Sequence, residues 1–273
     1  YQEHTAKGMS YVSMIMMLAP LLAPAIGSGI LWLASWQMIF VALAGYALLI
    51  LLLSWRYLPE TKTVSSQTAK PSFLSGYKVV FSNASARPDI ATSMFASFSF
   101  FCFLTAVPFV YIKFFGVNEQ QFSLLFGVNV AMLMLANFIN SRMVSRLGPQ
   151  RMLRAGLAVA LTSASALTLF NFWQLDLVFT VLSIAPLMAS LSLIATNADA
   201  MILMKFPDNS GTATAVIGTL RFGIGALAGP LLALFYNATP LPFTILMLVG
   251  VLCIALSQLW QQPFEQHAAS GAD

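Results

Sequence analysis

Long apolar runs recur along the whole chain, and they restrict its fold more than any other feature. They are Ser10–Trp32, Trp36–Tyr57, Ile90–Phe114, Gln121–Met143, Met152–Phe172, Leu177–Met204, Ala213–Tyr236 and Leu241–Trp260. Roughly 20 helical residues cross a bilayer core about 30 Å thick. Because the runs are continuously apolar and do not alternate, they predict helices and not the strands of a membrane barrel. The expected fold class is an all-α membrane protein with eight transmembrane helices.

The scarcity of charge supports this interpretation. Only 8% of the residues are charged and 59% are hydrophobic, whereas a soluble domain carries about 25% charged residues. This composition excludes a soluble enzyme, a disulfide scaffold and a disordered chain. The histidines, His4 and His267, lie in the polar ends of the chain, so a zinc enzyme or serine hydrolase within the membrane would have no base. We expect no enzymatic activity, no metal and no cofactor.

The basic residues lie in the gaps between apolar runs, which argues against a nucleic-acid partner. If the start of the chain is cytoplasmic, the cytoplasmic gaps hold Lys7, Arg56, Lys62, Lys70, Lys78, Arg87, Arg142, Arg146, Arg151, Arg154 and Lys205. Only Lys113 lies in a gap on the other side. Basic residues concentrate in cytoplasmic loops, so both ends of this chain are predicted to be cytoplasmic.

The domain organisation follows from one long polar segment. We expect residues 1–57 to hold two helices, 58–88 to form a cytoplasmic linker, 89–262 to hold six helices and 263–273 to form a cytoplasmic tail. The Pro/Gly/Ala-rich segment Leu18–Gly29 of the first run is echoed six runs later by Gly223–Leu232. A six-helix repeat is typical of transporters built from two related halves. On this register the chain corresponds to helices 5–12 of a twelve-helix protein, and we expect it to be a fragment of one.

Small residues let membrane helices approach closely, and proline bends a helix or interrupts its hydrogen bonds. We therefore expect the echoed segments to serve tight packing alone or, alternatively, a hinge. The residues concerned are Pro20, Pro24, Gly27, Gly29, Gly223, Gly225 and Gly229.

Arg221 is the most informative candidate for a functional role. It lies eight residues into its run, roughly 12 Å deep, where a charge facing lipid costs at least about 2.5–3.5 kcal/mol. We expect it to face the bundle interior, where it balances a carboxylate, contacts a substrate or bonds to backbone carbonyls. Asp199 precedes Lys205 by six residues, and it serves either in coupling or gating, or as a hydrated charge near the helix end. Asp89 begins a run and is expected to favour the helix start.

Other candidates are aromatic, amide and basic side chains. The third run is rich in aromatics, and we expect a subset that includes Phe98, Phe101 and Tyr111 to face a cavity for lipophilic ligands, the alternative being lipid. Asn129, Asn137 and Asn140 either line a pathway or bond between helices. The short loop with Arg142, Arg146 and Arg151 has a turn signal at Gly148-Pro149. Its arginines pair with carboxylates or lipid phosphates, or only set the topology. With no Gly-rich nucleotide loop in the sequence, transport would depend on an ion gradient.

Several segments resemble known transporters. Met9-Ser10-Tyr11 followed by Leu18–Gly27 resembles helix five, with its antiporter motif, of the drug:proton antiporters of the major facilitator superfamily. Three further segments resemble the Bcr/CflA family, the bicyclomycin-resistance type of multidrug efflux protein: Pro108–Ile112, Asn140-Ser141-Arg142 and Gly218–Ala226.

This resemblance implies a proton-driven exporter of small lipophilic or amphiphilic compounds. Such a protein alternates access to a central cavity in the bacterial inner membrane, and is expected to be monomeric when full length. The family's acidic proton-coupling position belongs to helices one to four, which this chain does not match, so the chain alone is not expected to transport. Two alternatives remain: an exporter of a metabolite such as a small amino acid or sugar, and a non-transporting membrane relic or scaffold.

Overall fold

The computed structural model describes residues 26–27, 29–30, 32–58, 73–206 and 209–270. In these ranges the protein is helical, and seven helical segments are long and apolar enough to cross a membrane. They are Gln37–Tyr57, Ala84–Phe114, Glu119–Leu147, Pro149–Phe172, Leu177–Lys205, Ser210–Leu234 and Leu241–Trp260. They confirm the expected all-α membrane fold and match the last seven apolar runs. The first run, with Pro20 and Pro24, falls almost entirely outside the described residues.

The chain divides into two compact units, Tyr1–Lys70 and Pro71–Asp273. In the first unit, α2 (Gln37–Tyr57) is a continuous helix whose one charged residue, Arg56, lies in the last turn. A cation is favourable there because the C-terminal end of a helix dipole is negative. None of the residues of α2 is buried.

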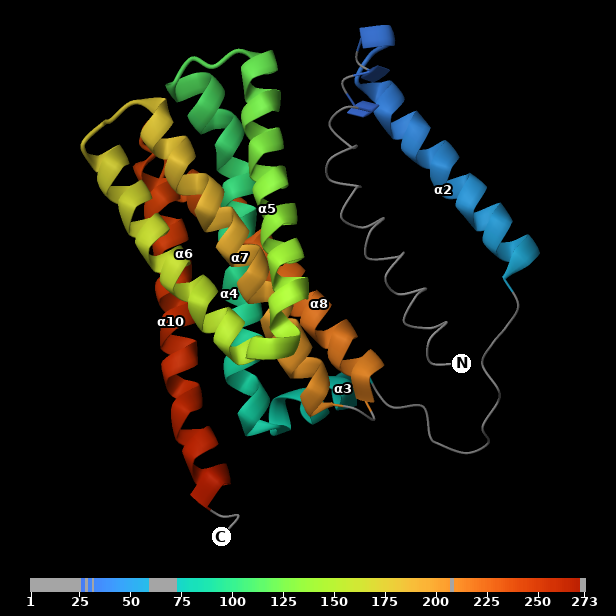
Figure 1. Cartoon of the computed structure of the whole chain (residues 1–273). Coiled ribbons are helices and arrows are strands. Elements are labelled where there is room, and N and C mark those ends of the chain that lie inside the picture. The colour runs from blue at the N-terminus through green and yellow to red at the C-terminus, as the bar shows by residue number, and fades with distance from the viewer. Residues whose placement is uncertain (1–25, 28, 31, 59–72, 207–208, 271–273) are drawn as a thin grey trace. The chain divides into compact units, whose positions relative to one another are not determined.

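The second unit is a helical bundle (Figure 1). Its elements are α3 (Phe73–Ser82), the 3-10 turn η1 (Ala84–Ala86), α4 (Arg87–Pro108), the π-helical segment η2 (Phe109–Phe114), α5 (Glu119–Leu147), α6 (Pro149–Phe172), α7 (Leu177–Lys205), α8 (Ser210–Ala226), α9 (Ala228–Leu234) and α10 (Leu241–Ser270). Local sequence explains several boundaries. Asn118 and Gln121 form a capping box at the start of α5, and Pro149 occupies the first position of α6, where its missing N–H is not needed.

α4 is the central helix of this bundle, in contact with α7, α8 and α10. More than half of its residues are buried, and they include the serines and threonine of its first three turns. The adjoining core is apolar and is formed mainly by α4, α6, α7 and α10. Polar side chains on the first turns of α4 therefore lie against neighbouring helices and must find partners there.

The seventh apolar run differs from the single helix that the sequence suggests. It is interrupted at Leu227, between α8 and α9. Leu227 donates its N–H to the Ile224 carbonyl at 3.1 Å. This hydrogen bond reaches back three residues along the chain, whereas the hydrogen bonds of an α-helix reach back four. Pro230 has no N–H to offer the carbonyl of Ala226, so the regular ladder of helical bonds loses a member at this point. The interruption lies in the Gly/Pro-rich segment for which the sequence leaves packing and a hinge open.

Candidate functional site

Four residues on one face of α4 make the contacts that define the candidate site. Asp89, Ser93, Ser97 and Phe101 follow one another at intervals of four residues, which places them in a row along the helix. Asp89 and Ser93 contact α7, whereas Ser97 and Phe101 contact α8. We call these four residues the α4 row.

The centre of the α4 row holds an ion pair between two apolar helices. Nη1 of Arg221, on α8, lies 2.6 Å from Oδ2 of Asp199, on α7. Ser93 Oγ donates a hydrogen bond of 2.6 Å to the other carboxylate oxygen, and Arg221 Nε donates one of 2.8 Å to Ser97 Oγ. Two hydroxyls of α4 therefore fix the orientation of both charged groups.

The ion pair is sheltered but not sealed. The side chains of Arg221 and Asp199 are 35% and 30% exposed. Arg221 thus pairs with a carboxylate, one of the three kinds of partner that its depth in the apolar run left open. Asp199 is not simply a hydrated charge at a helix end, because its two oxygens are engaged by α4 and α8. The roles of both residues in transport remain predictions.

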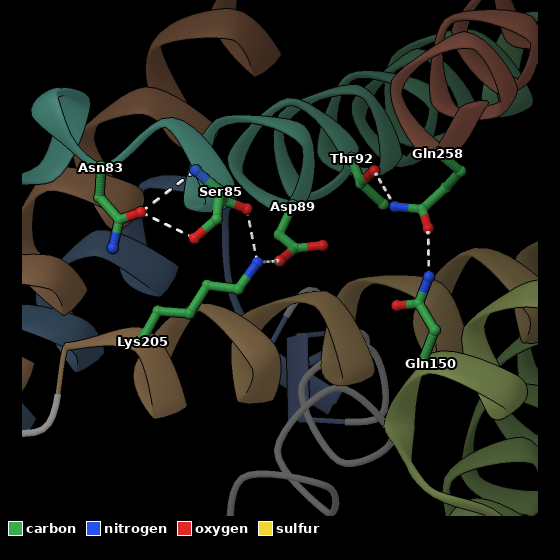
Figure 2. Close-up of polar contacts among 7 residues, drawn as sticks. All are labelled: Asn83, Ser85, Asp89, Thr92, Gln150, Lys205 and Gln258. Carbon is green, nitrogen blue, oxygen red and sulfur yellow. Dashed lines mark hydrogen bonds and ion pairs between the residues drawn. The ribbon is translucent and has the colours of Figure 1, made fainter. Parts of the chain in front are cut away.

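A second ion pair lies at the N-terminal end of the α4 row. Lys205 Nζ, in the last turn of α7, lies 2.6 Å from Oδ2 of the fully buried Asp89. The same ammonium donates to the Ser85 carbonyl at 2.5 Å (Figure 2). Oδ1 of Asn83 in turn accepts hydrogen bonds from the backbone N–H and the hydroxyl of Ser85. Asp89 does lie in the first turn of α4, as predicted. Its pairing with Lys205 is not visible from the sequence.

Replacing Lys205 by methionine is expected to lower the thermal stability of the detergent-purified protein by several degrees. The change leaves the buried Asp89 carboxylate without its ammonium partner, a loss of about 1–3 kcal/mol. Lys113→Met is the matched control, because Lys113 is exposed and its removal is expected to leave the melting temperature within about one degree. Equal melting temperatures for both variants and the wild type would contradict this assignment.

The C-terminal end of the α4 row, at Phe101, makes a close contact with α8. A Cβ atom on Gly225 would lie 2.4 Å from Cδ2 of Phe101, so α8 approaches α4 as closely as only glycine permits. Phe101 also packs edge-on against Phe222, with ring centroids 5.9 Å apart. For Gly223 and Gly229, in contrast, an added Cβ meets nothing within 4 Å among the described residues. The same holds for Gly27 and Gly29, so among the described residues close packing is seen at Gly225, and the roles of the other four glycines remain predictions.

The other predicted residues lie elsewhere in the bundle. Phe98 is buried toward Gly250 of α10, and Tyr111 is buried in η2 with its ring edge-on to Phe122. Asn129 is also buried, and its side-chain amide donates to the Leu125 carbonyl. Phe98 and Tyr111 thus fill the core from other faces or turns of the helix than Phe101, and a cavity lined by a subset of these aromatic residues remains a prediction.

Two further asparagines tie α5 to α7. Asn137 donates to Ser192 Oγ at 2.8 Å, and Asn197 donates to Asn140 Oδ1 at 2.9 Å. These contacts agree with the interhelical bonding that the sequence left open. Among the residues that the structure describes, no group of three or more His, Cys, Asp or Glu side chains could hold a metal ion.

Sequence reasoning did not identify Ser93, Ser97 and Lys205 as parts of the site. A signal was available in the spacing of four residues from Asp89 to Phe101, which is unusual in combining an acid, two hydroxyls and an aromatic ring on one apolar helix. Together with α7 and α8, the α4 row forms a site that can hold a proton or a polar group at Asp199 and Arg221. The aromatic rings of Phe101 and Phe222 can contact an apolar group.

Comparisons with known proteins show the family of this chain. The family model described as Major Facilitator Superfamily matches residues 1–230 and 91–272. Over 262 residues the chain is 33% identical to a bicyclomycin resistance protein homolog of Haemophilus influenzae, which covers 94% of this chain and 65% of that protein. It is 27% identical over 143 residues to the multidrug transporter MdfA of Edwardsiella piscicida, covering 52% and 35% of the two chains.

A third relative is the chloramphenicol resistance protein CraA of Acinetobacter baumannii, 25% identical over 181 residues, or 65% of this chain and 43% of that one. The chain thus spans less than two thirds of the length of these curated relatives. The similarity to the bicyclomycin resistance protein homolog confirms the resemblance to the Bcr/CflA type that the sequence motifs indicated.

Proposed function

Because the chain belongs to the major facilitator superfamily, we propose that it acts in a proton-coupled exporter of small lipophilic or amphiphilic compounds. The exporter works as a monomer in the bacterial inner membrane, with both ends of this chain on the cytoplasmic side. The relatives named for resistance to bicyclomycin, to chloramphenicol and to multiple drugs support this substrate class. The distribution of basic residues between the loops supports the orientation.

The observation that carries the proposal is the ion pair between Asp199 and Arg221. Two opposite charges within apolar helices are costly to keep unless they are paired, and these two remain about one third exposed. A proton on Asp199 would cancel the attraction and free the guanidinium, so protonation and the contacts between α7, α8 and α4 are linked. The pair thus joins an ionisable group to three helices that can change their relative positions.

The neighbouring aromatic rings suit the proposed substrates. Phe101 and Phe222 lie beside the ion pair. Phe101 follows Ser97 by one helical turn of α4, and Phe222 follows Arg221 directly on α8. An amphiphilic molecule could place its apolar part on these rings and its polar part against the charged pair. The interruption at Leu227 gives α8 and α9 a point at which the two segments can reorient during alternating access.

Efflux from cells tests the proposal. The complete reading frame is expressed in a bacterial strain that lacks its major exporters, and the accumulation of bicyclomycin, chloramphenicol and a fluorescent amphiphilic dye is measured. We expect lower accumulation than in cells with an empty vector, and loss of this difference when a protonophore collapses the proton gradient. Unchanged accumulation of all three compounds contradicts drug export, and export that survives the protonophore contradicts proton coupling.

A further inference from the structure

A cluster of arginines surrounds the short connection between α5 and α6. Arg142 and Arg146 lie near the end of α5, Arg151 lies in the first turn of α6, and all three are exposed. Only Gly148 separates the two helices. At 1.5 Å per helical residue, their α-carbons lie within about 10 Å of Gly148. We call Arg142, Arg146 and Arg151 the arginine corner.

The charge of the arginine corner is not balanced by its own helices. Between Glu119 and Asp176 the sequence contains no acidic residue. Neither of the interhelical ion pairs, Lys205–Asp89 and Arg221–Asp199, uses an arginine of the corner. Arg151 also lies at the positive end of the α6 dipole, where a cation is unfavourable, and the first turn of α6 contains no acidic residue. Bringing these charges together is therefore costly unless an anion binds against them.

The backbone of the corner is held in place from inside the bundle. Gln150, next to Arg151, donates to Gln258 Oε1 of α10 at 3.1 Å, and Gln258 donates to Thr92 Oγ1 of α4 at 2.9 Å (Figure 2). The next two residues, Met152 and Leu153, are buried in the core. The arginines thus extend outward from a base that two other helices fix, and they need little rearrangement to bind a ligand.

An exposed apolar surface adjoins the corner on α5. Leu135, Phe138 and Ile139 are 49%, 57% and 41% exposed, and helical spacing places them on the same side of α5 as Arg142 and Arg146. The guanidinium of Arg142 lies over the Phe138 ring, 5.2 Å from its centroid, a contact that positions the cation beside the apolar surface. A ligand that fits both surfaces carries an anionic group next to a hydrocarbon chain.

We propose that the arginine corner binds the phosphate headgroup of an anionic phospholipid of the cytoplasmic leaflet, with its acyl chains against Leu135, Phe138 and Ile139. Guanidinium groups pair with phosphate through two parallel hydrogen bonds, and basic sites on the cytoplasmic side of membrane proteins bind such lipids. Setting the topology requires only positive charge, which lysine supplies equally well. The corner instead uses arginine at every basic position, whereas the linker at 58–88 includes Lys62, Lys70 and Lys78. This site does not depend on the proposed substrates or proton coupling, and it rests on the proposed cytoplasmic side of this loop.

Native mass spectrometry of the purified complete protein tests the proposal, with phosphatidylglycerol and phosphatidylcholine of the same acyl chains as probes. The triple variant Arg142→Gln/Arg146→Gln/Arg151→Gln is expected to bind phosphatidylglycerol about 100-fold more weakly, since each cation near a membrane surface contributes about fivefold. Its binding of phosphatidylcholine should stay unchanged. The control Lys62→Gln/Lys70→Gln/Lys78→Gln removes the same charge from the linker and should alter phosphatidylglycerol binding by less than about threefold.

A second triple variant, with lysine at all three positions of the corner, protects the test against misfolding or inverted insertion. Lysine carries the same topological signal but cannot form the paired hydrogen bonds, so we expect normal insertion and about tenfold weaker phosphatidylglycerol binding. Wild-type affinity in either corner variant overturns the proposal. Equal losses in the glutamine variants of the corner and the linker also overturn it, because they indicate attraction to the overall charge and no defined site.

Discussion

Replacing Arg221 by alanine is expected to reduce drug efflux by about tenfold or more while the protein still inserts into the membrane. The substitution removes the hydrogen bonds to Asp199 and Ser97, and a hydrogen bond to a charged group contributes about 1.5–3 kcal/mol, where each 1.4 kcal/mol is a factor of ten. It also leaves the Asp199 carboxylate between apolar helices, with Ser93 as its remaining hydrogen-bond partner among the described residues. The measurement is dye efflux per unit of protein in the membrane fraction.

Two further variants separate a role in transport from a role in folding. Arg221→Lys keeps the charge but donates from a single nitrogen, whereas arginine reaches Ser97 through Nε and Asp199 through Nη1, so we expect intermediate efflux. Arg221→Ala combined with Asp199→Asn removes both charges, and removal of a whole ion pair often costs little stability. If the pair serves the mechanism, this double variant recovers wild-type protein levels but not efflux. Recovery of efflux would assign the pair a structural role only, and unchanged efflux in Arg221→Ala would remove the residue from the mechanism.

The fold could be predicted from the sequence because the membrane leaves few solutions. Continuous apolar runs must satisfy their backbone groups internally, so length and composition alone predict the helices. The break at Leu227 could not be placed in the same way. Gly and Pro are tolerated in transmembrane helices when neighbours compensate, and the sequence does not show whether Pro230 bends the helix or interrupts it.

The site was only partly predictable for a related reason. The depth of Arg221 in its run requires a partner, but the sequence offers several carboxylates near helix ends and does not say which one. Asp199 and Asp89 each meet a cation, Arg221 and Lys205 respectively, and the pairing depends on how α7 and α8 pack against α4. Helical spacing places residues on one face; the neighbouring helix that this face meets is decided by the packing of the whole bundle.

The glycines of α8 illustrate the same limit, and they give the second large effect. Gly225→Leu is expected to lower the yield of folded protein severalfold and the melting temperature by several degrees. Its Cβ alone would lie 2.4 Å from Cδ2 and 2.8 Å from Cε2 of Phe101, and overpacking of this kind costs about 1–3 kcal/mol or more. To accommodate leucine, α8 must move away from α4. This movement would also stretch the Arg221–Ser97 hydrogen bond, because Arg221 precedes Gly225 by one helical turn of α8. The measurements are fluorescence-detected size exclusion and thermal unfolding in detergent.

Gly223 supplies the matched control because it lies on the same helix, two residues away, with open space around its added Cβ. Alanine favours a helix over glycine by about 1 kcal/mol, so Gly223→Ala should leave the melting temperature unchanged or raise it. Gly225→Ala gains the same helix propensity and still should lower the melting temperature, since even a methyl group collides with the ring. A combined Gly225→Ala/Phe101→Leu variant tests the cause directly, because the shorter side chain is expected to relieve the collision. Equal melting temperatures for Gly223→Ala and Gly225→Ala would show that α8 and α4 do not approach this closely, and the position of Arg221 against Ser97 would then be in question as well.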